Sequence, residues 1–240
     1  MSFIPDHTNT CVDDTSIEIF NLKIQEPVTT LTDFLITVCC WYIFFRARKE
    51  VEKNHITELY LYFIFMMGLA TLFGGVFGHA LCYKLGVGFR LPGWIMSMVA
   101  VMLCERAAIM HTKKVMPAKV GKFFANANIV ELILLITITC ITLNFFFVEF
   151  HAFYGLLVVT GSFELYNYKK TKAASSKWIL YSVAFSSVAA VAHIWKLSPH
   201  PWFNYLDLAH SIMCVSVFIL YNGVRKITAE ESTFVKQTTQ

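Results

Sequence analysis

The chain has 240 residues, of which 56% are hydrophobic and only 15% are charged. Soluble domains carry roughly 25% charged residues, so much of this chain is expected not to be exposed to water. We expect one compact membrane domain, because few residues remain to form a soluble domain. The formal net charge of +4 is too small to favour nucleic acid as a partner. We expect membrane lipids as partners, and a protein partner or a homo-oligomer stays open.

The first 30 residues are polar and acidic and contain no apolar run, so we expect no cleavable signal peptide and a first membrane helix that acts as its own insertion signal. The seven cysteines show no paired spacing, and most fall inside apolar runs, where cysteine behaves as a small hydrophobe. The sequence has no CxxC motif, so a zinc knuckle or a redox pair is not indicated.

Seven apolar runs are long enough to cross a hydrocarbon core of roughly 30 Å, which takes about 20 residues. We predict spans at about 31–47, 58–82, 92–111, 128–148, 150–168, 177–196 and 204–224. Only Glu149 and its neighbours divide the fourth span from the fifth, so a very tight hairpin is expected there. The predicted fold class is an all-α membrane protein, a multi-pass bundle of seven transmembrane helices. It divides into an extracytoplasmic polar leader (1–30), a transmembrane domain (31–226) and a cytosolic tail (227–240).

The lysines and arginines predict the orientation of the bundle, because loops on the cytosolic side carry an excess of both. Of the 20 basic residues, 15 follow the first, third, fifth and seventh spans. They are Arg46, Arg48, Lys49, Lys53, Lys113, Lys114, Lys119, Lys122, Lys169, Lys170, Lys172, Lys177, Arg225, Lys226 and Lys236. This alternation predicts an N-terminus outside and a C-terminus in the cytosol, and it supports the count of seven.

Four ionisable side chains are predicted to share one depth near the outer ends of the second, sixth and seventh spans. They are His79, His193, Asp207 and His210, and Asp207 and His210 are three residues apart on one helix face. Ionisable residues inside spans are costly, so each suggests a functional site. Imidazole and carboxylate together are the ligands that zinc takes in proteins, and glycines at 74, 75 and 78 allow close helix packing.

A simpler interpretation stays open beside the metal site. The histidines can reach the headgroup layer or bond to a neighbouring helix, and Asp207 can serve as an acid at a helix N-terminus. Among the remaining polar residues, Glu105 and Glu164 are candidates for pairing with a neighbouring helix, and Glu164 also for lining an inner cavity. His111 and His151 are predicted at the membrane interface, and Glu131 at the inner start of the fourth span.

Several segments resemble the CREST superfamily of seven-span membrane proteins, which includes alkaline ceramidases, progestin and adipoQ receptors and Per1-type lipid-remodelling proteins. The resemblance lies in GGVFGHALCY around His79, RLPGWIMSMVAVMLCER in the third span, EFHAFYGLLV in the fifth and WFNYLDLAHSIM around His210. Together these stretches cover 49 of the 240 residues, about a fifth of the chain. The resemblance implies a zinc ion held by histidines within the membrane and hydrolysis of lipid amides or esters.

Three positions depart from the ceramidase pattern, so the resemblance implies an altered metal site. Ceramidases carry a second histidine four residues before the one that matches His210, where this chain has Leu206. Gly75 stands where that family has a serine, and Phe89 and Arg90 occupy the region where it has an aspartate. Asp207 or His193 would then replace the missing ligand.

The sequence supports a zinc-dependent lipid amide or ester hydrolase first. The alternative is a non-catalytic receptor, lipid-binding protein or assembly partner on the same scaffold, which the missing serine and aspartate favour. A haem protein is disfavoured because two histidine pairs at matched depths are missing, and a rhodopsin because the last span contains no lysine for a Schiff base. A transporter stays open, although no span is visibly broken by glycine or proline at mid-membrane.

Overall fold

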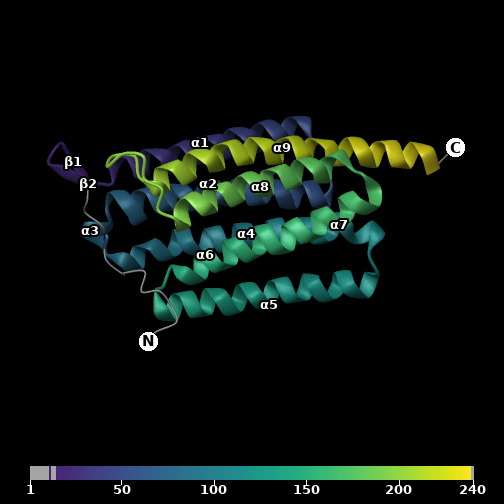
Figure 1. The fold of residues 1–240 in the computed structure, drawn as a ribbon, viewed down its shortest axis with the longest axis horizontal. Coiled ribbons are helices and arrows are strands. Elements are labelled where there is room, and N and C mark those ends of the chain that lie inside the picture. Colours follow the sequence, from purple (N-terminus) through teal and green to yellow (C-terminus); the bar gives the residue numbers. More distant parts are fainter. Residues whose placement is uncertain (1–10, 12–14, 239–240) are drawn as a thin grey trace.

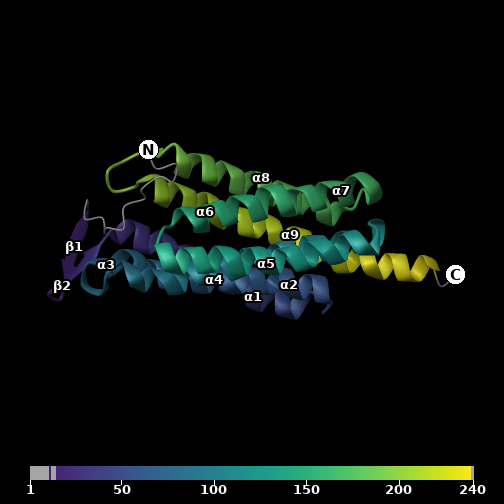
Figure 2. The same cartoon turned by 90° about the horizontal axis from the view of Figure 1, so that it is seen from below.

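The computed structural model describes residues 11 and 15–238, with side chains described as far as 230. Within this range seven helical segments are long and apolar enough to cross a membrane, which confirms the predicted number of spans. The segments run side by side as one bundle, and the last helix extends beyond it (Figures 1 and 2). Asp6, Asp13 and Asp14 of the predicted leader lie outside the described residues, as does the side chain of Lys236.

Three spans are single whole helices, three are composite, and the seventh is the first part of a longer helix. The single helices are α1 (Pro27–Glu50), α5 (Ala118–Thr142) and α8 (Ala174–Ile194). Span two joins α2 (His55–Phe73) to the π-helix η1 (Gly74–Ala80), and the short α3 (Cys82–Leu85) follows it. Span three consists of η2 (Val87–Arg90), α4 (Leu91–His111) and η3 (Thr112–Val115). Span five consists of α6 (Phe146–Phe153), the π-helix η4 (Tyr154–Thr160) and α7 (Gly161–Thr171). Span seven is the first part of α9 (Tyr205–Thr238).

The predicted boundary of the fourth span was wrong. The helix α5 begins at Ala118, about ten residues earlier than predicted, so Glu131 lies in its middle and not at its inner start. The helix ends at Thr142. The next residue, Leu143, has a left-handed backbone (φ 51°), and the Asn144 side chain accepts a hydrogen bond from the Phe146 N–H. The tight hairpin therefore exists, but its turn is 143–145, and Glu149 lies in the first turn of α6.

The polar leader contains a short antiparallel hairpin of β1 (Ser16–Ile19) and β2 (Leu22–Gln25). A disulfide between Cys11 and Cys82 joins the leader to α3. The sequence did not suggest this pair, because the two cysteines are 71 residues apart and carry no motif. The hairpin and α3 lie at one end of the bundle and the end of α9 at the other (Figure 1).

The main apolar core is formed by buried side chains of α1, α2, α4, α8 and α9, among them Ile43, Ile64 and Ile179. A second, smaller core joins Met98 of α4 to Leu132 and Leu135 of α5 and Val148 of α6. The helix α5 lies at the edge of the bundle and packs against α4 and α6 (Figures 1 and 2). It is therefore the span with the least support from its neighbours.

A buried polar network lies at the end of the bundle opposite the hairpin. Glu164 is fully buried and accepts hydrogen bonds from Tyr60 Oη at 2.7 Å and from the His111 ring at 2.9 Å. Asn167, one turn further along α7, donates to Ser176 Oγ at 2.9 Å. This arrangement confirms the expected pairing of Glu164 with a neighbouring helix, because Tyr60 belongs to α2 and His111 to α4.

We predict that Tyr60→Phe lowers the thermal unfolding midpoint of the purified protein in detergent. The change removes a buried donor from the Glu164 carboxylate, which costs about 1–3 kcal/mol. Tyr62→Phe is the matched control, because Tyr62 lies on the same helix with 43% of its surface exposed. Equal midpoints for the two variants would contradict the structural role of the Tyr60–Glu164 hydrogen bond.

Candidate functional site

A buried carboxylate lies between two of the predicted histidines. Asp33, in the second turn of α1, has only 3% of its surface exposed. Its Oδ2 atom is 3.8 Å from His79 Nε2, and its Oδ1 atom is 3.6 Å from His210 Nε2. Spans one, two and seven thus each bring one side chain to the same place, near the hairpin end of the bundle.

The opposite nitrogen of each ring is held by a polar partner. His79 Nδ1 lies 2.8 Å from Glu26 Oε2, and His210 Nδ1 lies 3.0 Å from Thr32 Oγ1. When Nδ1 donates its hydrogen to such an oxygen, Nε2 keeps the lone pair that faces Asp33. Histidines that bind metals usually have this arrangement, in which an outer partner fixes the tautomer and the ring orientation.

The Asp33 carboxylate is the buried group of this cluster with an unsatisfied oxygen. Its Oδ2 atom is buried and, among the described residues, has no hydrogen-bond partner. Buried polar atoms are nearly always paired, and an unpaired carboxylate oxygen inside a membrane is especially costly. Two imidazole nitrogens and a carboxylate oxygen are the kinds of donor that zinc takes in proteins. Their ligand atoms are not all within 4.8 Å of one another, a spacing that among the described residues only Glu105, Glu131 and His151 meet.

Asp207 lies beside this group but is engaged in local structure. Its Oδ2 atom accepts the Asn204 N–H at 2.7 Å, while Asn204 Oδ1 accepts the Leu206 N–H at 2.8 Å, so the two side chains cap the start of α9. Its Oδ1 atom accepts from Thr32 Oγ1 at 3.3 Å, and Thr32 also contacts His210. Asp207 thus reaches His210 through Thr32 and has the helix-terminal role of the simpler interpretation.

His193 has a different partner. Its Nε2 atom lies 2.5 Å from Glu149 Oε1 of α6, and its ring meets the Tyr205 ring edge to face at a centroid distance of 5.2 Å. The structure thus brings His79 and His210 together at Asp33, connects Asp207 to them through Thr32, and pairs His193 with a carboxylate of the fifth span.

Glycines in η1 make room for the carboxylate. A Cβ atom at Gly75 would lie 3.0 Å from Asp33 Cβ and 3.4 Å from the Thr30 carbonyl, closer than ordinary contact. Arg90, in the region where the ceramidase resemblance expected an aspartate, donates a hydrogen bond from Nε to the Gly78 carbonyl of the π-helix at 3.1 Å. Single-turn π-helical insertions are frequent at functional sites.

Sequence reasoning missed Asp33, Glu26 and Thr32. Asp33 had a usable signal, because it is an acid inside the predicted first span at the outer end, at the depth assigned to His79. Glu26 lies before that span in the leader, and Thr32 is uncharged, so neither stood out. Their roles follow only from the contact of α1 with η1 and α9.

By length and composition, the seven long apolar helices are those of a multi-pass membrane protein, and ionisable side chains gather between them. Residues 28–229 match the model of a family of unknown function, DUF6962, and the chain belongs to this family. No curated protein and no solved structure matches the chain. The family match covers all seven spans but carries no activity, and it does not address the CREST resemblance.

We predict that Gly75→Ala destabilises the protein by about 1–3 kcal/mol, because the added methyl group must displace Asp33 or α1. The adjacent Gly74→Ala is the control, since its Cβ atom would meet Asp33 Oδ2 at an ordinary 3.8 Å. Thermal unfolding in detergent should show a lower midpoint for Gly75→Ala alone. A midpoint unchanged in both variants would contradict the close packing of Asp33 on Gly75.

Proposed function

We propose that this protein is an intramembrane, zinc-dependent hydrolase of lipid amides or esters, with its metal held by His79, His210 and Asp33. The observation that carries the proposal is the Asp33 carboxylate, buried between two imidazole Nε2 atoms at 3.6 and 3.8 Å. In this proposal Asp33 is the third ligand, in place of Asp207 or His193, which the sequence analysis had suggested for that role.

Each residue of the group has a defined part in the proposal. Glu26 contacts the His79 ring and Thr32 the His210 ring. With the hydrogen on Nδ1 of each ring, both Nε2 lone pairs would face Asp33. A zinc ion held there would supply Lewis-acid chemistry, polarising a lipid carbonyl and making water a nucleophile near neutral pH. The side chains of His79 and His210 are 20% and 15% exposed, so the site is open enough for a small polar group to approach.

The partial resemblance to alkaline ceramidases supports a lipid amide or ester as the substrate class. The site would act near one end of the bundle, at the depth where lipid headgroups meet the acyl chains. The second candidate is a lipid-binding or receptor protein on the same scaffold. It is favoured by Gly75, which stands where ceramidases have serine, and by the engagement of Asp207 in the helix cap.

We predict that purified wild-type protein retains zinc and that Asp33→Asn and His79→Ala/His210→Ala lower its zinc content by about one equivalent. The same variants should abolish turnover of a panel of ceramides, phospholipids and monoacylglycerols in detergent micelles. His55→Ala is the control, because His55 is exposed and begins α2 at the opposite end of that span. A zinc content unchanged by both site variants would contradict the proposed ligands. Saturable lipid binding without turnover would select the second candidate.

We also propose the orientation with the hairpin end outside and the end of α9 in the cytosol. The alternation of basic residues supports it, and so does the Cys11–Cys82 disulfide at the hairpin end, since disulfides persist in oxidising compartments.

The orientation predicts which single cysteines react in intact cells. With the native free cysteines replaced, Ser198→Cys in the loop before α9 should react with a membrane-impermeant maleimide. Lys119→Cys, at the start of α5, should react only after permeabilisation. The reverse pattern would overturn the orientation.

A further inference from the structure

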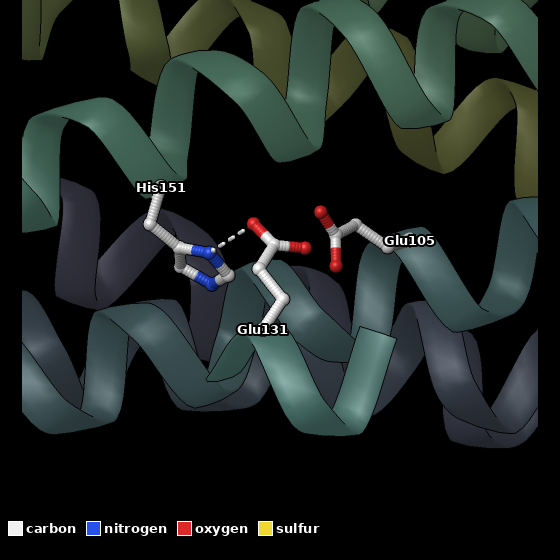
Figure 3. A group of neighbouring side chains, drawn as sticks. All are labelled: Glu105, Glu131 and His151. Carbon is white, nitrogen blue, oxygen red and sulfur yellow. Dashed lines mark hydrogen bonds and ion pairs between the residues drawn. The ribbon is translucent and has the colours of Figure 1, made fainter. Parts of the chain in front are cut away.

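A second cluster of ionisable side chains lies between three helices, apart from the Asp33 group. Glu105 of α4, Glu131 of α5 and His151 of α6 each offer a ligand atom, and these atoms all lie within 4.8 Å of one another (Figure 3). Glu105 and His151 are fully buried. His151 was expected at the membrane interface, and that expectation was wrong, because the ring points inward between three helices (Figure 3).

The tautomer of His151 decides what must lie beside it. Its Nε2 atom is 3.0 Å from the Met98 carbonyl, which can only accept, so this nitrogen carries the hydrogen. In the neutral ring, Nδ1 then carries a lone pair, and it faces Glu131 Oε1 at 3.2 Å. Two acceptors at this distance repel unless a cation lies between them or one of them takes a proton.

The Glu105 carboxylate also lacks a donor for one of its oxygens. Its Oε2 atom accepts from Asn128 Nδ2, but its Oε1 atom is buried and has no hydrogen-bond partner among the described residues. Asn128 Oδ1 is likewise buried and unpaired. Arg106, the next residue in the sequence, donates hydrogen bonds from its guanidinium group to the Ala125 carbonyl. Within the described residues, no lysine or arginine forms an ion pair with either carboxylate of the cluster.

A glycine of η4 leaves the space that the Glu105 carboxylate occupies. A Cβ atom at Gly155 would lie 2.5 Å from Glu105 Oε1 and would also collide with Val101. Only glycine at this position leaves the carboxylate its place, facing Glu131 (Figure 3). Of the two π-helices, η1 thus packs on Asp33 and η4 on Glu105.

We propose that Glu105, Glu131 and His151 bind a divalent transition-metal ion, such as zinc or manganese, at a site separate from the Asp33 group. Two carboxylate oxygens and an imidazole nitrogen suit such ions. Bonds of about 2.0–2.2 Å place two ligands of one ion roughly 3–4 Å apart, and the 3.2 Å between Nδ1 and Oε1 matches this spacing. The ion would neutralise both carboxylates and accept the lone pair of His151 Nδ1.

An ion at this site would hold three helices together. The helix α5 packs against α4 and α6, and those three helices supply the three ligands. Metal binding therefore ties the edge helix to the bundle. Because an ion that binds only the folded state stabilises it by mass action, the thermal midpoint should rise with metal concentration.

The proposal is tested in the His79→Ala/His210→Ala background, so that its outcome does not depend on the outer site. The full-length protein in detergent is stripped with a chelator, equilibrated with zinc, freed of excess metal and analysed by mass spectrometry. This background should hold about one equivalent of zinc, and adding Glu105→Gln/Glu131→Gln should reduce it below about a tenth. A background protein without zinc, or an unchanged content after the two glutamine changes, would overturn the site.

Two controls separate metal binding from folding. Glu164→Gln removes another fully buried carboxylate and should leave the zinc content unchanged. In addition, zinc should raise the thermal unfolding midpoint of the His79→Ala/His210→Ala protein, and a chelator should reverse the rise. This measurement leaves Glu105, Glu131 and His151 unchanged. If zinc does not move the midpoint, the three residues hold a proton and not a metal, and the proposal fails.

Discussion

A carboxylate between membrane-spanning helices must find a hydrogen-bond donor or a cation, because the hydrocarbon offers neither. This constraint organises the interior of the protein. Glu164 meets it with hydrogen bonds from Tyr60 and His111. Asp33 and Glu105 each keep one buried oxygen that has no hydrogen-bond partner among the described residues. The functional proposals all follow from that difference between satisfied and unsatisfied carboxylates.

The two unsatisfied carboxylates share a local design. Each lies against a glycine of a π-helical segment, Asp33 against Gly75 and Glu105 against Gly155. Each cluster also contains a histidine whose other ring nitrogen lies against an oxygen: His79 faces Asp33 and has Glu26 at its other nitrogen, and His151 faces Glu131 and has the Met98 carbonyl at its other nitrogen. The π-helices widen the turn, the glycines remove the side chain that would clash, and the outer acceptors direct the ring lone pairs inward.

The seven spans could be predicted from hydropathy and loop charge because each long apolar run is nearly independent of the others. The fourth span shows the limit of this approach. Its first turns carry Lys119 and Lys122, which were assigned to a loop, although helix α5 includes both. Asn144 was the local signal for the following turn, since an asparagine side chain often caps the start of a helix.

The candidate site was predictable only in part. His79 and His210 stood out as histidines at span ends, but their shared partner Asp33 depends on how α1 packs against η1 and α9. Such packing is not encoded in the spacing of residues along one helix. The same holds for His151, which the sequence assigned to the interface, because its carbonyl partner and its carboxylate partner come from two other spans.

The central claim is that the Asp33 carboxylate and the Nε2 atoms of His79 and His210 share one metal ion. Zinc X-ray absorption spectroscopy on the Glu105→Gln/Glu131→Gln protein isolates this site from the inner one. The account predicts nitrogen and oxygen ligands at about 2.0–2.2 Å with the scattering pattern of two imidazoles, and one imidazole fewer in His210→Ala. A sulfur-ligated zinc, or a spectrum unchanged by His210→Ala, would contradict it.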